Sequence, residues 1–373
     1  MKETSDIDSM AQLVLPSTDL TKDMEFFTKL GFRLDHIFPS DDPAVAVMSG
    51  HSLTLRLDKD VTGGPATFHI LTDHPESIAG SRSELVVAPN GTKIKIMPKT
   101  YKLNTPQTQH KFEVRKLQNN DPWVIGRAGM LYRDLIPDRL GGSIIASHIN
   151  IPDGGPVPDM VHYHTIGFQL IFCYRGWVKL VYEDQGPPFI LEAGDCVTQP
   201  PEIRHRVLEA SDNLEVIEIG VPSDHMTTID HEMDLPNKPI NPQRTFQGQQ
   251  FCHHIASKAD WSKWKIPGFE YRDTGINQST NGVAGVHVAR VLNPDYQGAT
   301  ISNKADILFT FVMKGSFKLV VNDQSTNHIS VGDAYVIPPD LKYQMQNCSS
   351  DLELLQVSLP GDSKTTIELL QQT

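Results

Sequence analysis

The sequence predicts a mainly β chain in which two β-barrels follow one another after a small α+β domain. A long internal repeat runs from about residue 110 onward, and each copy consists of short strands separated by turn residues, with little helical periodicity. Short strands with turn signals about every 8–12 residues are typical of antiparallel sandwiches and barrels.

The repeat is recognised from residues that recur at a nearly constant spacing. Tyr132-Arg133-Asp134 recurs 139 positions later as Tyr271-Arg272-Asp273, and Gly194-Asp195 recurs 138 positions later as Gly332-Asp333. Duplicated segments of one chain are expected to share one fold. In the first copy, the expected strands are rich in Val, Ile, Phe and Tyr. They lie at Ser143–Asn150, Gln169–Tyr174, Trp177–Glu183, Cys196–Gln199, His205–Leu208 and Leu214–Val221.

The first hundred residues differ in kind. Asp19 is expected to cap a helix that places Met24, Phe26, Phe27 and Leu30 on one face and stops at Gly31. Strands are expected at Leu13–Leu15, Phe32–Phe38, Ala44–Met48, Leu53–Leu57, Ala66–Leu71, Glu84–Val87 and Thr92–Met97, with a hairpin turn at Pro89-Asn90-Gly91.

These patterns divide the chain into four parts. Residues 1–100 form a separate module, 110–222 the first barrel, 223–248 a linker and 249–373 the second barrel. The linker carries Pro236, Pro239 and Pro242 among polar residues, which is typical of a surface segment.

Composition limits the partners. The net charge of −12 repels phosphate backbones and anionic lipid, so neither nucleic acid nor a membrane is expected as a partner. No apolar stretch approaches the roughly 20 residues that span a bilayer. Cys173, Cys196, Cys252 and Cys348 show no CxxC spacing and are expected to be reduced thiols. The expectation is a cytoplasmic protein that acts on a small molecule.

Three histidines and a glutamine can converge inside the first barrel. Residues two apart on a strand share a face, so His162 and His164 can both point inward. Gly167 lets the chain turn, so that Gln169 can point inward from the next strand, and His205 would arrive from a third strand. The four groups converge only if the chain curls into a barrel.

These segments resemble the two motifs of the cupin superfamily. The first motif is Gly155, six residues, His162-x-His164, four residues, Gln169, six residues and Gly176; the second is Gly194, five residues, Pro200, Glu202 and, three residues on, His205. The resemblance implies a double-stranded β-helix, or jelly roll, with His162, His164, Gln169 and His205 as ligands to one divalent transition metal such as Fe, Mn, Ni or Zn. The donor chemistry agrees, because imidazole nitrogen and amide oxygen suit these ions and four ligands leave positions open for substrate. Gln169 stands where the family usually has Glu, and Glu202 where it has Gly.

The second copy lacks this set. The repeat offset places Ile301, Asn303, Leu308 and Tyr343 at the four ligand positions, so the second barrel is expected to have a structural, dimerising or substrate-covering role, which includes a possible homodimer. The offset also equates His148 with His287 and favours a structural role for both. His148 nevertheless remains a weak pocket candidate, together with Ile171, Cys173 and Val207, which share the inward register of the ligands.

The chemistry is expected to follow from Gln169. A neutral amide leaves the metal its full charge, which favours Lewis-acid activation of a chelated keto, enol or sugar-acid-like substrate for isomerisation, cyclisation or elimination. Some uronate ring-opening enzymes and polyketide cyclases of the superfamily have the same ligand set. Two alternatives remain open: an Fe(II)-dependent cupin dioxygenase and a non-catalytic small-molecule sensor. No catalytic acid or base is identified from the sequence.

The N-terminal module resembles the glyoxalase, or vicinal-oxygen-chelate, family. The resemblance is carried by Leu13-Val14-Leu15, Asp19-Leu20, Phe26-Phe27, Leu30-Gly31-Phe32 and Ala88-Pro89-Asn90-Gly91-Thr92. It implies a metal ligand at Gln12, but the carboxylate expected on Leu53–Leu57 is absent. The module is therefore expected to be structural or to gate the substrate.

Overall fold

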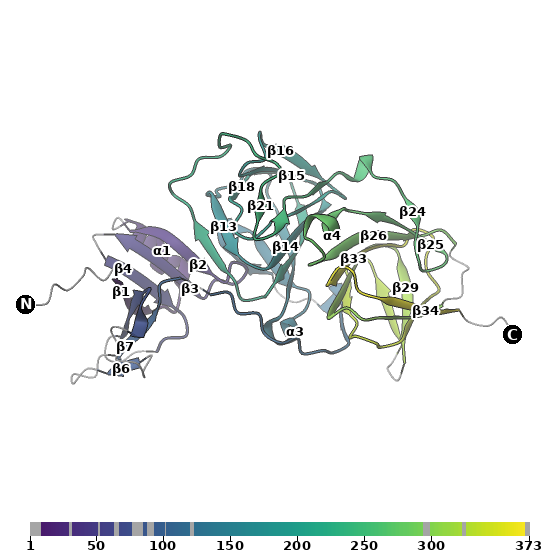
Figure 1. Cartoon of the computed structure of the whole chain (residues 1–373), viewed down its shortest axis with the longest axis horizontal. Helices are drawn as coiled ribbons and strands as arrows, with labels where there is room; N and C mark the ends of the chain where they lie inside the picture. The colour runs from purple at the N-terminus through teal and green to yellow at the C-terminus, as the bar shows by residue number, and fades with distance from the viewer. Residues whose placement is uncertain are drawn as a thin grey trace, which may run out of the picture.

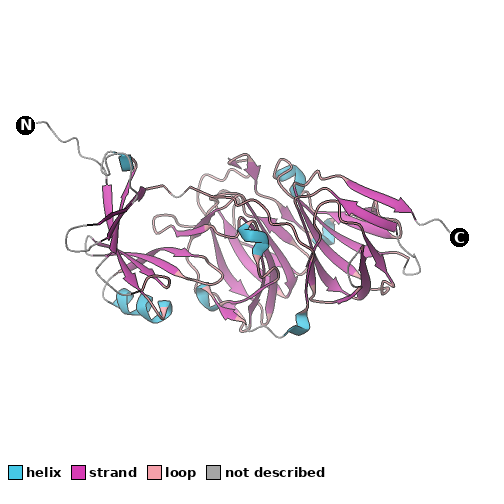
Figure 2. Ribbon diagram, turned by 90° about the horizontal axis from the view of Figure 1, so that it is seen from below, coloured by secondary structure: helices cyan, strands magenta, loops and turns pink. Residues whose placement is uncertain are grey.

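The computed structural model describes residues 9–29, 32–50, 53–62, 67–76, 85–87, 93–100, 102–119, 123–293, 299–322 and 326–369. Strands dominate and helices are short, which confirms the prediction of a mainly β chain (Figure 2). The N-terminal module, the first barrel and the second barrel follow one another along the long axis, coloured from purple through teal to yellow (Figure 1). No described helix has the length and apolar character needed to cross a membrane.

The N-terminal module is one sheet covered by a helix. Its elements are β1 (Ser9–Pro16), α1 (Leu20–Lys29), β2 (Arg33–Phe38), β3 (Val45–Gly50), β4 (Leu53–Asp58), β5 (Thr67–Thr72), β6 (Leu85–Val87) and β7 (Lys93–Pro98). The sheet order is β2-β3-β4-β1-β5-β7-β6. The Asp19 carboxylate accepts a hydrogen bond from the backbone N–H of Lys22 (3.1 Å), which confirms the expected N-cap. The expected helix stop at Gly31 and the turn at Pro89-Asn90-Gly91 lie outside the described residues.

The first barrel consists of two facing sheets with the orders β16-β15-β18-β13-β20 and β23-β17-β14-β19-β11-β10-β9. Six of its strands match predicted ones within two residues at each end. Its elements are β9 (Val124–Ile125), η2 (Arg127–Gly129), β10 (Leu131–Asp134), α3 (Arg139–Gly142), β11 (Ile145–Ile151), β12 (Gly155–Pro156), β13 (His162–Thr165), β14 (Phe168–Arg175), β15 (Trp177–Tyr182), β16 (Phe189–Glu192), β17 (Cys196–Thr198), β18 (His205–Ala210), β19 (Leu214–Val221) and β20 (Met226–Ile229).

The second barrel repeats this arrangement with sheets of order β24-β25-β26-β33-β28-β31-β8 and β30-β29-β32-β27-β34. Its elements are β24 (Ser262–Lys263), β25 (Phe269–Asp273), α4 (Ile276–Ser279), β26 (Gly285–Val291), β27 (Ala299–Asn303), β28 (Ile307–Lys314), β29 (Ser316–Val321), β30 (Asn327–Ser330), β31 (Ala334–Val336), β32 (Tyr343–Gln346), β33 (Glu353–Leu359) and β34 (Thr365–Leu369). The remaining short elements are β8 (Glu113–Arg115), η1 (Leu117–Asn119), β21 (Thr245–Phe246), β22 (Gln249–Gln250), β23 (His253–His254) and η3 (Ala256–Lys258).

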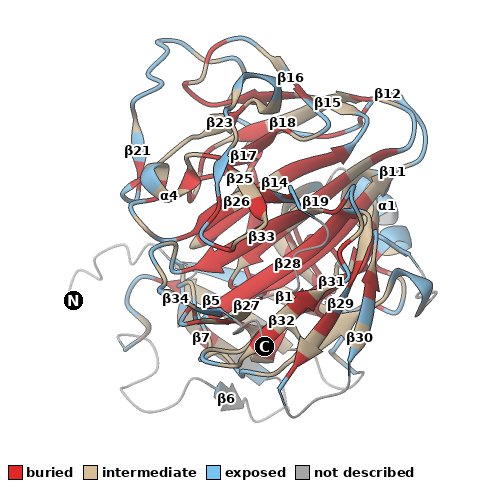
Figure 3. Cartoon of the chain, turned by 90° about the vertical axis from the view of Figure 1, so that its right-hand side faces the viewer, coloured by how far each residue is buried: buried red, intermediate tan, exposed pale blue. Residues whose placement is uncertain are grey.

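The two barrels share an apolar core. Phe172 and Ile217 of the first barrel lie in one buried cluster with Phe309, Phe311 and Leu355 of the second. Figure 3 shows the strands β14, β19, β28 and β33 as a buried layer through the middle of the molecule. One face of each strand is apolar and packs against the neighbouring barrel, whereas the other face points into its own barrel and also carries polar residues such as Glu218 and Gln356.

The barrels also exchange strands. β8, which precedes the first barrel in sequence, pairs with β31 of the second barrel, and β23 pairs with β17 of the first. Each barrel therefore contains a short strand from the sequence that adjoins the other one.

The segment expected to be a surface linker contains a buried strand. β20 pairs with β13 on one side and with β2 of the N-terminal module on the other, so that Thr227 lies between His164 and Ile37. One continuous sheet thus joins the N-terminal module to the first barrel. The sequence did not predict this strand, because it is only four residues long and follows a loop rich in polar residues.

Candidate metal centre

Three imidazoles meet inside the first barrel. His162 and His164 are buried on β13 while Tyr163 between them points outward, as the strand alternation predicts. His162 lies directly opposite His205 in the antiparallel ladder, and the ring centroids of these two residues are 4.2 Å apart. The possible ligand atoms of all three residues lie within 4.8 Å of one another, and no other such group of three occurs among the described His, Cys, Asp and Glu residues.

The outer nitrogen of each ring is held by the protein. His162 Nδ1 donates to the Met160 carbonyl (2.7 Å), and His205 Nδ1 donates to the Ile203 carbonyl (2.9 Å). His164 Nδ1 is hydrogen-bonded to the Thr227 hydroxyl (2.9 Å). Contacts of this kind fix the ring orientation and the tautomer of metal-binding histidines, and here they leave Nε2 of each ring for a metal ion.

The histidines are neutral at physiological pH. Burial lowers the pKa of His162 and His164 well below the usual value, and neighbouring cationic groups add to the effect. Burial also lowers the pKa of His205 to about 4. Because a metal ion binds the deprotonated ring, this environment suits a metal site.

The amide of Gln169 is oriented by Glu218. Gln169 lies buried on β14, and its Nε2 donates to Oε1 of Glu218 (2.5 Å). Its Oε1 is a buried atom without a hydrogen-bond partner among the described residues. Glu218, which holds this amide, lines the same cavity as the three imidazoles, and an unpaired buried amide oxygen is a suitable neutral donor for a divalent metal ion.

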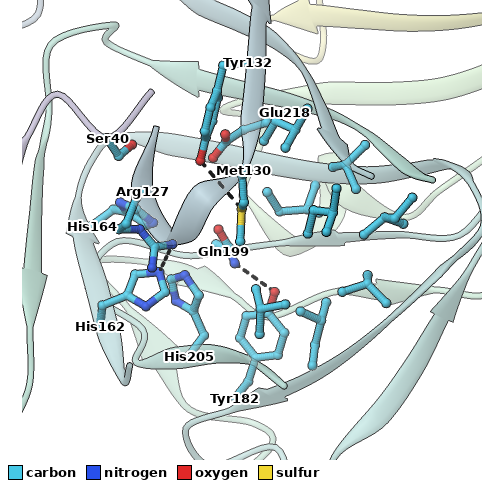
Figure 4. A pocket seen from close by; sticks show the side chains of 18 residues that line it. Ser40, Arg127, Met130, Tyr132, His162, His164, Tyr182, Gln199, His205 and Glu218 are labelled. Carbon is cyan, nitrogen blue, oxygen red and sulfur yellow. Dashed lines mark hydrogen bonds between the residues drawn. The ribbon is translucent and has the colours of Figure 1, made fainter. Parts of the chain in front are cut away.

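Arg127 brings a positive charge to the site. The Nη2 group of Arg127 donates to His162 Nε2 (2.9 Å, Figure 4). Its Nη1 group pairs with the buried Asp159 carboxylate. Asp159 Oδ2 also accepts from the backbone N–H of Val207 (2.9 Å), which fixes the carboxylate. The lone pair on Nε2 serves one partner at a time, so metal binding at His162 requires Arg127 to give up this bond.

A mainly apolar cavity opens beside the imidazoles. Its free volume is about 640 Å³ including the mouth. It is lined by Ser40, Arg127, Met130, Tyr132, Ile149, Ile151, His162, His164, Ile171, Val178, Leu180, Tyr182, Gln199, His205, Val207, Leu214, Val216 and Glu218. Figure 4 shows the histidines and Arg127 on one side of this space and Tyr182, hydrogen-bonded to Gln199, on another. Ile171 and Val207 are the two predicted pocket residues found in this wall.

The other two predicted pocket residues lie elsewhere. His148 is on the far side of the sheet, where its ring contacts Tyr174 and Phe311 and its Nε2 is hydrogen-bonded to Glu215 (2.7 Å). Cys173 is fully buried, and burial raises the pKa of its thiol to about 12. All four cysteines are free, as expected.

His148 and His287 are not structural equivalents, although the repeat offset equates them. Arg133 pairs with His148, whereas the corresponding Arg272 pairs with Val288. The copies differ by one residue here, and a shift of one residue moves a side chain to the opposite face of the sheet. His287 therefore faces the interior of the second barrel.

Sequence reasoning missed Glu218 as an acid of the cavity. Burial raises the pKa of Glu218 to about 7, Asp41 adds to this rise, and the hydrogen bond from Gln169 opposes it. The available signal was the position of Glu218 two residues beyond Val216, which places both side chains on the same face of the strand. Arg127 gave no such signal, because it comes from a turn whose position depends on tertiary contacts.

The N-terminal module contributes to the cavity wall through the loop after β2. Ser40 lines the cavity, and the neighbouring Asp41 carboxylate accepts a hydrogen bond from Arg139 of the first barrel (2.6 Å). This buried contact holds the loop against the barrel mouth. Gln12, at the position implied by the glyoxalase resemblance, is also buried but lies in a separate polar hollow.

In the second barrel, no imidazole occupies the four corresponding positions. Ile301 pairs with Tyr343 as His162 pairs with His205, and Ile301, Leu308 and Tyr343 are all buried in the core of that barrel. The prediction that this copy lacks the ligand set agrees with this placement.

Comparison with known proteins rests on structure. No family model matches the sequence, and no curated protein matches it. Salicylate 1,2-dioxygenase from Pseudaminobacter salicylatoxidans is similar, with a TM-score of 0.53 and 15% identity over 71% of this chain and 90% of that chain. Its adduct with gentisate matches with a TM-score of 0.51 and 14% identity over 71% and 87%. The protein Ylba from E. coli matches with a TM-score of 0.48 and 10% identity over 69% and 94%. The likeness to the dioxygenase shows that this chain has a cupin-like fold.

Proposed function

We propose that this chain is an Fe(II)-dependent dioxygenase that acts on a small, mainly apolar carboxylic acid. The observation that carries the proposal is a buried three-histidine cluster at the wall of a mostly aliphatic cavity, with the Arg127 guanidinium in contact with it. The likeness in fold to salicylate 1,2-dioxygenase supports it. A bound iron(II) ion would supply the electrons for dioxygen activation.

The cavity wall favours an apolar substrate over a sugar acid. Ile149, Ile171, Leu180 and Val216 present no hydrogen-bonding groups to a ligand. Recognition of a polyhydroxylated substrate requires several polar partners, because each buried hydroxyl left unpaired costs about 1–3 kcal/mol. An aromatic or alicyclic ring has no hydrogen-bonding groups that such a wall would leave unpaired.

The chain's own residues have distinct roles in this proposal. Arg127, freed from His162 by a metal ion, binds the substrate carboxylate through its planar fork. Asp159 holds the guanidinium in place. Glu218 orients the amide of Gln169, whose Oε1 would be the fourth ligand beside the three Nε2 atoms. The hydrogen bond between Tyr182 and Gln199 fixes these two side chains in the opposite wall of the cavity.

Lewis-acid catalysis of an isomerisation, cyclisation or elimination is the competing proposal. The unpaired Oε1 of Gln169 favours it, because a neutral ligand set leaves the metal ion its full positive charge. A non-catalytic sensor is a third proposal, and it requires ligand binding without product.

We further propose that the N-terminal module is a glyoxalase-like domain that covers the substrate. Ser40 in the cavity wall and the Asp41–Arg139 contact support this role. The module would then limit the size of the substrate that the cavity admits.

Oxygen uptake by iron(II)-loaded protein tests the dioxygenase proposal. With salicylate and gentisate as probes, we expect uptake that His162→Ala abolishes. Arg127→Leu should raise KM about tenfold or more, because it removes a charge-assisted contact, and Arg127→Lys should restore part of the loss. Conversion of a probe under strict anaerobiosis would support the Lewis-acid proposal instead. Probe binding without oxygen uptake or product would support the sensor.

A further inference from the structure

The interior of the second barrel opens into a cavity unlike that of the first. Its free volume is about 1120 Å³ including the mouth, and its walls come from β24, β25, β26, β27, β33 and β34. It lies at the end of the barrel that corresponds to the metal centre in the first copy, because Asn303 occupies the position of His164.

Buried polar side chains form the floor of this cavity. Gln356 pairs with Thr310 across the ladder as Glu218 pairs with Ile171, so Gln356 occupies the position of Glu218. His287 lies opposite Gln356. Asn303 and Gln356 are both less than one-tenth exposed. Barrel interiors of this size are usually filled by apolar side chains. Here the Gln356 amide donates to the Thr310 hydroxyl (3.3 Å) and the Asn303 amide donates to the Thr365 hydroxyl (2.8 Å), so neighbouring side chains hold both polar groups in place at the floor.

His287 has a nitrogen that lacks such a partner. Its Nε2 is buried and makes no hydrogen bond to any described residue, while Trp264 and Tyr271 pack against its ring edge-on with centroids 5.1 and 5.7 Å away. Burial lowers the pKa of His287 to about 4, so the ring is neutral and offers one donor and one acceptor. A buried nitrogen left unpaired is unfavourable, which favours occupation of the cavity.

The rim of the cavity carries positive charge. Lys263 and Lys265 lie at its edge against one acidic residue, Asp273, in a chain whose net charge is −12. A local excess of cations on an acidic protein attracts a small anion. The polar floor suits hydroxyl groups, and Trp264 supplies an apolar wall for a carbon chain.

We propose that the second barrel is a metal-independent binding site for a small hydroxylated carboxylate. The carboxylate lies at Lys263 and Lys265, and the hydroxyl groups bond to His287, Gln356 and Asn303. This site is separate from the proposed dioxygenase centre, so either proposal can fail without the other.

Calorimetric titration of the full chain with D-gluconate and L-malate tests the site, with xylitol as the uncharged control. We expect one equivalent of acid to bind with a Kd of about 1 mM or tighter, unchanged by a chelator and by His162→Ala. Gln356→Leu should weaken binding roughly tenfold through loss of hydrogen bonds in the floor. Lys265→Glu should weaken the acids and leave xylitol unaffected, and circular dichroism should show that both variants are folded.

Three results would overturn the proposal. Absence of heat with both acids would indicate that water fills the cavity. Binding that both second-barrel variants leave intact, or that His162→Ala abolishes, would place the ligand elsewhere.

Discussion

The two barrels have the same register at the ladder that carries the metal-site positions, but different side chains occupy those positions. His162 faces His205 in the first, and Ile301 faces Tyr343 at the same ladder position in the second. Even the supporting hydroxyl is kept: Thr227 bonds His164 (2.9 Å) and Thr365 bonds Asn303 (2.8 Å) at matching pairs. A backbone that places ligand positions correctly therefore does not by itself make a metal site, because the donor atoms lie in a few side chains.

Removing one imidazole should have the largest effect on the difference in metal binding between the two barrels. His162→Ala takes away a buried ligand with a fixed tautomer, so bound metal should fall severalfold in protein purified without added metal, as measured by elemental analysis. Tyr343→Phe, at the second-barrel position that corresponds to His205, is the control and should leave the metal content unchanged. Equal metal content in the two variants would refute the assignment of the site to the first barrel.

A substitution in the core that the two barrels share should give the next largest effect, a loss of stability. Phe172→Ala opens a cavity between the barrels and should lower the free energy of unfolding by about 3–5 kcal/mol, as measured by urea denaturation. Ile190→Ala, at an exposed position of β16, should change it by less than about 0.5 kcal/mol. Because both barrels contribute to this core, fluorescence and circular dichroism should shift together. A shift confined to one of two separate transitions would show that the barrels are stable independently.

Substitution of Thr227 should have a smaller effect, which is confined to metal affinity. Thr227→Val removes the hydrogen bond that orients His164 and should weaken metal affinity about 10- to 100-fold, as measured by competition with a chromophoric chelator. Thr227→Ser should recover most of the affinity. Thr365→Val, the same change in the second barrel, should leave it unaltered; equal losses in the two valine variants would argue against a local role for Thr227.

The sequence predicted the strands of the first barrel well and its connections less well. Leu214–Val221 was predicted with the bounds that the structure has. Its apolar residues lie between turn residues, and this local pattern indicates a buried strand. β20 and the exchanged strands β8 and β23 were not predicted. Such strands are only two to four residues long, and their pairing partners are distant in sequence.

Local pattern alone determined the duplicated β architecture and the two inward-facing histidines of β13, because spacing along a strand fixes which side chains share a face. Only the tertiary structure brought Arg127 from a turn, Glu218 from β19 and Ser40 from the N-terminal module to the same cavity. It also placed His148 and His287 on opposite faces, although the repeat equates them. The physical reason is that packing between segments distant in sequence sets the strand register and the loop positions. A local sequence pattern does not contain this information.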